Sequence, residues 1–178
     1  MMSLNVVFWL FIAVFGLIGM SRGWAKELLV SFSVIVGVFI IVVLETYVPF
    51  IRDGLARDPG GTIFYVRAGI LLGMVFFGYQ SPNLPRIAGS NRFAREKLQD
   101  ALLGLFLGAV NGYLIMGTMW HFIDAAGYPF AIILPPPDGP GGDAARELIK
   151  ILPPVWLRPP MVFFAVALAF AFIIIVFI

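Results

Sequence analysis

The stretch Ala101-Leu-Leu-Gly-Leu-Phe-Leu-Gly-Ala-Val-Asn-Gly-Tyr-Leu-Ile-Met-Gly-Thr-Met-Trp-His-Phe-Ile123 decides the fold class of this chain. It is apolar and long enough to cross a membrane as a helix, because about 20 residues span the hydrocarbon core. Its glycines Gly104, Gly108 and Gly112 recur at every fourth position and form a strip without side chains on one helix face. In lipid, such strips let two helix backbones approach closely. The stretch therefore predicts a membrane helix packed tightly against a second helix.

The composition of the whole chain agrees with this prediction. Of the 178 residues, 61% are hydrophobic and 12% are charged, whereas about a quarter of the residues of soluble domains are charged. The net charge of +2, with no run of basic residues, argues against a nucleic-acid partner. The absence of cysteine excludes disulfides and thiolate metal sites. We expect one compact unit in a lipid bilayer.

Five apolar stretches are candidate spans, so the expected fold is an all-α integral membrane protein with four to five transmembrane helices. The stretches are Leu4–Met20, Leu28–Phe50, Ile63–Tyr79, Ala101–Ile123 and Pro160–Ile178. They divide the chain into a four-span core (1–123), a Pro- and Gly-rich outer loop (124–159) and a C-terminal apolar span (160–178). The last stretch barely matches the hydrocarbon thickness, and a half-buried tail packed on the other helices is its alternative.

The outer loop contains one expected helix. Residues Ala144–Leu152 have an apolar and a polar face, and Asp143 precedes them as a candidate cap. This pattern is typical of an amphipathic helix that lies on the membrane surface. The rest of the loop is expected to be irregular because of its proline clusters. Tyr128, Phe130 and Trp156 are expected at the membrane interface.

The short connection Ser21–Lys26 predicts a tight turn and an antiparallel hairpin of the first two spans. Basic residues near span ends face the cytoplasm, so the Ser21–Lys26 turn and the segment 81–100 are expected inside and the amino terminus outside. The expected inner residues are Arg22, Lys26, Arg86, Arg92, Arg95 and Lys97, against Arg52, Arg57, Arg146, Lys150 and Arg158 outside.

Asn111 is the polar residue nearest the middle of its span, so its amide needs a partner in the membrane. We expect a hydrogen bond across a helix interface, with a pore-lining role as the alternative. Small residues that could receive the glycine strip occur in two other spans. They are Ser31, Ser33 and Gly37 in the second span, and Gly69 and Gly73 in the third.

Four further polar residues are expected together at the outer boundary: Glu45, Arg67, His121 and Asp124. Arg67 and Glu45 are expected to pair and to hold two spans together. One histidine and one aspartate do not complete a zinc site, so no metal is expected. A pigment or haem lying over Gly117 with His121 as axial ligand is an alternative to an empty site. Otherwise no cofactor is expected.

No motif predicts an enzyme. The chain lacks a Walker loop, a Gly-x-Ser-x-Gly elbow, a His-Glu-x-x-His helix and a dinucleotide fingerprint.

The hairpin Gly16-Leu-Ile-Gly-Met-Ser-Arg-Gly-Trp-Ala-Lys-Glu-Leu-Leu-Val-Ser-Phe-Ser-Val-Ile-Val-Gly37 resembles the colicin V production protein (CvpA) family. These bacterial inner-membrane proteins join their first two spans through an Arg-Gly turn followed by a Glu, which here are Arg22, Gly23 and Glu27. The strip within Leu98 to Ile115 resembles the fourth span of that family, although Asn111 stands where the family often has Arg. The apolar tail Met161 to Ile178 also departs from the family.

The resemblance implies a non-enzymatic inner-membrane scaffold or accessory protein linked to toxin production or export and to envelope maintenance. Its partners would be the bilayer and either a second copy or other membrane subunits. Two alternatives remain. One is an oligomeric channel or transporter lined by Asn111. The other is an accessory subunit of a large respiratory or photosynthetic complex.

Overall fold

The computed structural model describes residues 4–55, 61–80 and 94–177, and these residues form helices and connections without a β-strand. The expected positions Arg57, Arg86 and Arg92 lie outside this described part. The elements are α1 (Leu4–Arg22), α2 (Trp24–Tyr47), the π-helical turn η1 (Phe50–Gly54), α3 (Thr62–Tyr79), α4 (Ala94–Ala125), α5 (Pro140–Ile149), α6 (Pro153–Trp156) and α7 (Met161–Phe177).

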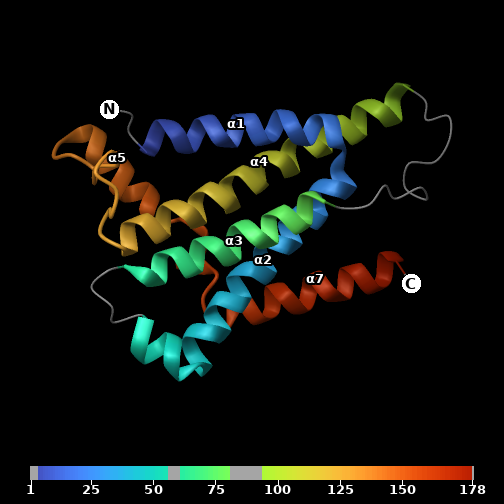
Figure 1. The fold of residues 1–178 in the computed structure, drawn as a ribbon. Helices are drawn as coiled ribbons and strands as arrows, with labels where there is room; N and C mark the ends of the chain where they lie inside the picture. Colours follow the sequence, from blue (N-terminus) through green and yellow to red (C-terminus); the bar gives the residue numbers. More distant parts are fainter. Residues whose placement is uncertain (1–3, 56–60, 81–93, 178) are drawn as a thin grey trace.

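Within the described residues, four helices are long and apolar enough to cross a membrane: α1, α2, α3 and α4. They lie side by side (Figure 1), which confirms the expected all-α membrane fold. The bundle has two ends. We call the end with the α1–α2 turn the hairpin end, and the end where α1 begins and α4 stops the loop end.

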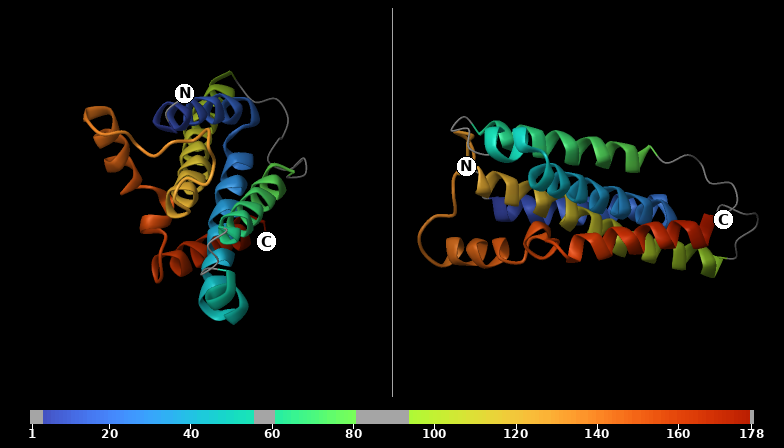
Figure 2. Two further views of the ribbon diagram at one scale, coloured as in Figure 1. Left: turned by 60° about the vertical axis from the view of Figure 1, so that its left-hand side comes forward. Right: turned by 90° about the horizontal axis from the view of Figure 1, so that it is seen from below.

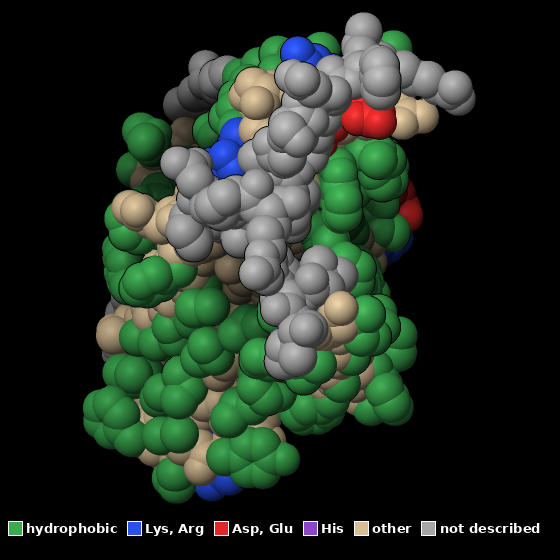
Figure 3. All heavy atoms as spheres, turned by 90° about the vertical axis from the view of Figure 1, so that its right-hand side faces the viewer, with side chains coloured by type: hydrophobic (Ala, Val, Ile, Leu, Met, Phe, Trp, Pro, Cys, Tyr) green, Lys and Arg blue, Asp and Glu red, His purple; other side chains and the backbone are tan. Residues whose placement is uncertain are grey.

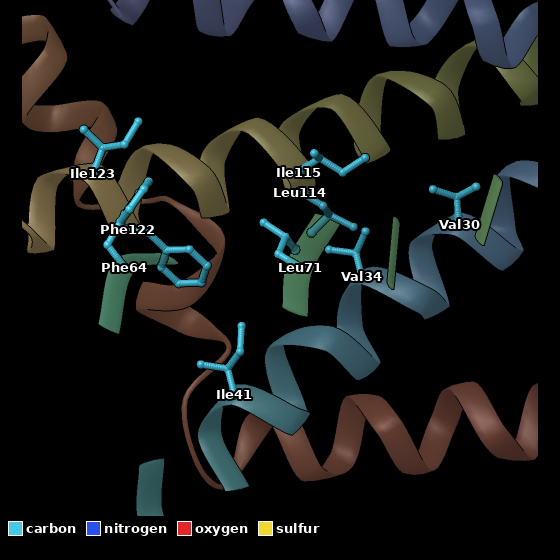
Figure 4. Packing of buried hydrophobic residues seen from close by; sticks show 9 residues of the cluster. All are labelled: Val30, Val34, Ile41, Phe64, Leu71, Leu114, Ile115, Phe122 and Ile123. Carbon is cyan, nitrogen blue, oxygen red and sulfur yellow. The ribbon is translucent and has the colours of Figure 1, made fainter. Parts of the chain in front are cut away.

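The direction of the helices follows from their contacts. Gly23 has a φ of 86°, a conformation that glycine adopts readily, and it turns the chain directly from α1 into α2. Phe64 near the start of α3 packs with Phe122 near the end of α4, and both helices meet again at Leu71 and Leu114 (Figure 4). Successive long helices are therefore antiparallel.

Branched and aromatic side chains fill the space between α2, α3 and α4. Val30, Val34 and Leu71 are fully buried there (Figure 4). In a bilayer this core gains little from leaving water, since lipid tails are as apolar as leucine. Its stability comes from close packing and from polar contacts between helices.

The surface of the bundle is apolar on its flanks. In the view of the hairpin end, most of the coloured side chains are hydrophobic and charged side chains appear at few places (Figure 3). Large exposed side chains occur on several helices, including Leu17, Tyr65, Phe77 and Leu168. Such a surface suits lipid.

The helix expected at Ala144–Leu152 is displaced. The structure has α5 at Pro140–Ile149, with Gly139 as its N-cap residue, so Asp143 lies inside the first turn and is not the cap. Pro140 occupies the first helical position, where a proline is pre-organised and loses no hydrogen bond. The helix thus begins four residues before the expected start at Ala144 and ends three residues before the expected end at Leu152.

The chain after α5 runs down beside α4. The hydroxyl of Tyr113 donates a hydrogen bond to the carbonyl oxygen of Ile151, and Trp156 Nε1 donates to the Tyr113 hydroxyl at 3.0 Å. Tyr113 precedes the end of α4 at Ala125 by twelve residues, or roughly 18 Å at 1.5 Å per residue. Trp156 therefore lies partway along the bundle and not at the level where α4 ends, and its side chain is 46% exposed.

The apolar stretch Pro160–Ile178 forms α7, a helix of 17 residues. It lies along α2 on the side away from α1 (Figure 2), with Phe163 against Phe39 and Phe172 against Phe32. It starts well short of the end of α2 and is shorter than the four long helices. The fifth apolar stretch of the sequence thus forms α7. We call residues 150–160, which precede α7, the inserted segment.

Irregular backbone is tolerated inside a membrane protein only where protein or water covers it. The inserted segment meets this condition through Leu152, Pro153 and Leu157, which are buried. Leu157 packs with Val162 of α7 and Val38 of α2.

Candidate functional site

The glycine strip packs against α1. Gly104 meets the backbone of Gly19, and Gly19 also faces Gly108. A Cβ atom built on Gly108 would lie 2.9 Å from the Cα of Gly19, and one on Gly112 would lie 2.8 Å from the Cα of Ile12. Any side chain at these positions would push the helices apart, so glycine is required for the α1–α4 interface.

The second span does not receive the strip. The side chain of Ser33 faces Gly78, where an added Cβ would lie 2.8 Å from the serine hydroxyl. Likewise, a Cβ added at Gly37 would lie 3.2 Å from the Cβ of Met74. Ser33 and Gly37 instead hold α2 against α3, because α1 covers the strip before α2 can reach it.

The third span does not receive the strip either. A Cβ on Gly69 or on Gly73 would meet no atom within 4 Å. Around them Tyr65, Leu72 and Phe76 are 59%, 52% and 59% exposed. We call Tyr65, Gly69, Leu72, Gly73 and Phe76 the α3 open face, and no described part of the chain packs over its glycines.

Asn111 is completely buried and fully engaged. Its amide nitrogen donates to the carbonyl oxygen of Glu27 at 2.9 Å and to the carboxylate Oε2 of Glu27 at 2.8 Å. Its amide oxygen accepts a hydrogen bond from the hydroxyl of Ser31 at 2.7 Å. The partner that the sequence required across a helix interface is thus Glu27 together with Ser31 on α2.

Glu27 extends this network to two more helices. Its side chain has no exposed surface, and Oε1 lies 2.8 Å from Nε of Arg22. The Arg22 guanidinium lies 4.4 Å from the centre of the Tyr79 ring, and its Nη1 donates to the Tyr79 carbonyl oxygen at 3.5 Å. We call Arg22, Glu27, Ser31, Tyr79 and Asn111 the polar network, and it joins α1, α2, α3 and α4.

The turn beside the network is also fixed from α4. The Trp24 backbone N–H donates to Oδ1 of Asp100 at 3.3 Å. A Cβ on Gly23 would lie 2.9 Å from both carboxylate oxygens of Asp100. Arg22, Gly23 and Glu27, singled out as a turn motif, therefore lie together and dock on α4.

The polar network holds the long helices together. A buried charge is tolerated when it is paired and hydrogen-bonded, and Glu27 is both. Because Asn111 and Glu27 are 0% exposed, neither side chain lines an open path through the described bundle. The pore-lining alternative for Asn111 does not match this arrangement.

The expected pair at the loop end is present. Arg67 donates from Nε to Glu45 Oε1 at 2.6 Å and from Nη2 to Glu45 Oε2 at 3.0 Å. Both side chains remain about a quarter exposed (22% and 27%). This two-pronged contact fixes α3 to α2.

The Phe122 ring connects this pair with His121. It lies 5.7 Å from the Arg67 guanidinium carbon and packs edge-on with the His121 ring. The Nδ1 atom of His121 is buried without a hydrogen-bond partner. Asp124 follows His121 by three residues on α4, and its charge acts on the His121 imidazole.

A flat macrocycle has no room over Gly117. A Cβ at that position would already lie 2.7 Å from Cδ of Pro153 and 3.3 Å from Cδ2 of Leu152. The pigment or haem alternative is therefore wrong, because the inserted segment covers the glycine that it needed. Within the described residues, no group of three or more His, Asp or Glu side chains is placed to hold a metal ion.

A cavity of about 350 Å³ opens at the loop end between α1, α4 and the proline-rich chain before α5. Its polar lining consists of Asn5, Trp120 and Tyr128, and the rest is apolar. Burial raises the pKa of Tyr128 to about 12, so its hydroxyl stays protonated at neutral pH. Among the described residues that line the cavity, none has a charged side chain.

Sequence reasoning found Asn111 but missed its partner. Glu27 and Ser31 stand at i and i+4, so they share one face of α2. That spacing, together with the need of Asn111 for a donor and an acceptor, is the signal that identifies them.

Comparison with known proteins gives no further identification: no protein-family model, no curated protein and no solved structure matches this chain.

Proposed function

We propose that the protein is a non-enzymatic membrane scaffold or accessory subunit that binds a transmembrane helix of another protein on the α3 open face. The observation that carries this proposal is the contrast between its two glycine surfaces. Gly104, Gly108 and Gly112 are closed by α1, whereas Gly69 and Gly73 have open space above them.

Small residues one helical turn apart are the usual contact between membrane helices, because they let dispersion and weak hydrogen bonds act between backbones. Gly69 and Gly73 have this spacing. Tyr65 and Phe76 stand at the two ends of the face and would limit the sliding of a docked helix. An incoming helix would therefore meet a shallow, bounded seat.

The polar network supports the same proposal. It ties the four long helices together at the hairpin end, and the pair of Glu45 and Arg67 ties α2 to α3 at the loop end. A helix held at both ends presents a fixed surface, as a scaffold requires. A channel gains no comparable support, since the polar side chains of the network bond to one another.

The cellular setting is proposed from the resemblance of the hairpin alone. It suggests a bacterial inner membrane and a role in toxin production or export and in envelope maintenance. An accessory subunit of a respiratory or photosynthetic complex would use the same α3 open face and differ in its partner.

The test is quantitative pull-down from native membranes in mild detergent, followed by mass spectrometry. The double variant Gly69→Leu with Gly73→Leu should reduce recovery of specific membrane partners at least about tenfold, or ~1.4 kcal/mol. Ala167→Leu is the matched control, because it adds the same side chain to an exposed position on α7.

The thermal midpoint of the double variant in detergent should remain close to that of the unchanged protein, because a Cβ at Gly69 or at Gly73 meets no atom within 4 Å. Equal partner recovery from the double variant and from Ala167→Leu would refute the proposal.

A further inference from the structure

One face of α5 and of the residue that follows it carries four charged side chains in two ion pairs. Asp143, Arg146, Glu147 and Lys150 stand at i, i+3, i+4 and i+7, so they share one helix face. Asp143 pairs with Arg146, and Glu147 pairs with Lys150. The four side chains are between 41% and 71% exposed. We call these four residues the α5 polar stripe.

α5 runs from the loop end toward the middle of the bundle. In the right-hand view of Figure 2, its axis points along the length of the bundle. Gly141 near its start lines the loop-end cavity together with Leu4 and Asn5, the first residues of α1. Ile151, just beyond its end, lines a hollow with Ile12, two turns further along α1. The α5 polar stripe therefore extends inward beside a spanning helix.

The depth of the stripe follows from α1. This helix has 19 residues, or roughly 28 Å at 1.5 Å per residue, which is close to the thickness of the hydrocarbon core. Its start at Leu4 therefore marks the loop-end boundary of the hydrocarbon. A Cβ on Gly112 would lie 2.8 Å from the Cα of Ile12, which is roughly 12 Å along α1 from Leu4. Tyr113, the next residue of α4, donates to the carbonyl oxygen of Ile151. The inner end of the stripe is thus well inside the hydrocarbon.

The inner ion pair cannot reach the boundary. Counted back from Ile151, Lys150 is roughly 10 Å and Glu147 roughly 6 Å inside it. The Lys150 ammonium is held by the Glu147 carboxylate, which fixes its position within one helical turn. Charged groups exposed at such a depth cannot face lipid tails, because hydrocarbon offers no hydrogen-bond partner. This side of α5 therefore faces water or polar protein.

The hydrogen bonding of the stripe favours water. Each ion pair is electrically neutral, so the stripe does not call for a charged partner. An ammonium has three donors and a carboxylate has about four acceptor sites, and among the described residues Glu147 and Lys150 bond only to each other. Most of their donor and acceptor sites are therefore left for small molecules that can both donate and accept. The outer pair of Asp143 and Arg146 continues the polar face to the loop end, where water enters.

We propose that the α5 polar stripe lines a water-filled vestibule that opens at the loop end and reaches about 10 Å into the membrane. The vestibule is blind. Beyond Lys150, the hollow between α1, α4 and Ile151 is lined by apolar and aromatic side chains, apart from the hydroxyl of Tyr113. Water and small hydrophilic molecules thus enter from the loop-end side without crossing the bundle. The vestibule is separate from the α3 open face and does not depend on the proposed partner.

The test is thiol labelling of the full chain in native membranes, so that any partner stays in place. Lys150→Cys is treated with a positively charged thiosulfonate reagent that does not cross membranes and that restores a cation at this position. It should react from the side that labels Asp138→Cys, at a rate within about tenfold, because a thiol reacts as the thiolate, which forms in water. Labelling from the opposite side only would overturn the proposal.

Leu72→Cys is the control for depth. Leu72 is 52% exposed on α3, and its neighbour Leu71 packs with Leu114, which follows Tyr113 on α4. The surroundings of Leu72 are apolar whether lipid or a partner helix covers it. Lys150→Cys should react at least about a hundredfold faster than Leu72→Cys.

Equal rates for these two variants would overturn the proposal, because lipid or protein would then cover the stripe. If Lys150→Cys does not fold, Glu147→Cys replaces it. A negatively charged reagent then restores the anion, and the same comparison with Leu72→Cys applies.

Discussion

At the scale of single residues, Asn111 shows how a polar group is accommodated in this bundle. One amide group satisfies a carboxylate, a backbone carbonyl and a hydroxyl on α2. The same helix contains Thr118, which is equally buried but whose hydroxyl has no hydrogen-bond partner. Both side chains are fully buried, but only that of Asn111 is hydrogen-bonded, so the two can be compared by mutation.

Asn111→Leu should destabilise the protein by about 1–3 kcal/mol, because Glu27 loses a donor and Ser31 loses an acceptor in a buried site. Thr118→Val should cost much less, since it keeps the shape and removes an unbonded hydroxyl. Both are measured as the free energy of unfolding in detergent or bicelles. Equal costs would mean that the network bonds add no stability.

The requirement of Asn111 for a partner could be predicted from the sequence, whereas the identity of that partner could not. Counting residues along each span gives depth, but it does not give the rotation of one helix against another. Placing Glu27 beside Asn111 also requires that α2 begins at Trp24, four residues before the predicted span at Leu28. The tight Gly23 turn makes this early start possible.

At the scale of elements, the pairing of α1 with α4 dominates the bundle. The sequence predicted the α4 side of this interface, the glycine strip, because repeated glycines in an apolar helix usually mark close helix packing. It did not single out Gly19 as the opposite surface, since one glycine in a span is weaker evidence than a ladder of three.

Gly108→Leu should destabilise the fold itself by at least about 1–3 kcal/mol, because the side chain would enter the backbone of α1. Gly73→Leu should leave the fold unchanged, since a Cβ at this position meets no atom within 4 Å. The thermal midpoint of the purified monomer in detergent distinguishes them. A stable Gly108→Leu monomer that had lost only its oligomeric state would contradict the internal role of the strip.

The inserted segment was the element least accessible to sequence reasoning. Its prolines forbid a continuous helix, but composition does not say whether such a segment lies outside the bundle or within it. The contacts of Gly117 with Pro153 and of Tyr113 with Ile151 place the inserted segment against α4. They are long-range contacts, and single-sequence patterns report local ones.

At the scale of the whole molecule, α1 to α4 run alternately between the two ends, and α7 runs back from the interior toward the hairpin end. Phe32 of α2 and Phe172 of α7 thus pack against each other, although the sequence separates them widely. Basic residues at the hairpin end favour its placement in the cytoplasm.

The absence of cysteine from the sequence makes this orientation directly measurable. Ser21→Cys at the hairpin end should react with a membrane-impermeant thiol reagent only after the cells are lysed. Asp138→Cys at the loop end should react in intact cells, because both positions are exposed but lie at opposite ends. Reaction of both variants in intact cells, or the reverse pattern, would refute the expected orientation.

The α1–α4 interface also sets an order for assembly during biosynthesis. Gly19 and Gly104 are separated by 85 residues, so α1 enters the membrane before its main partner has been translated. At a synthesis rate of about 5–20 residues per second, this delay lasts roughly 4–17 s. For that time the glycine surface of α1 is open to other nascent helices. The α1–α2 hairpin is therefore the form of this protein in which a membrane chaperone or a mispaired helix would first meet it.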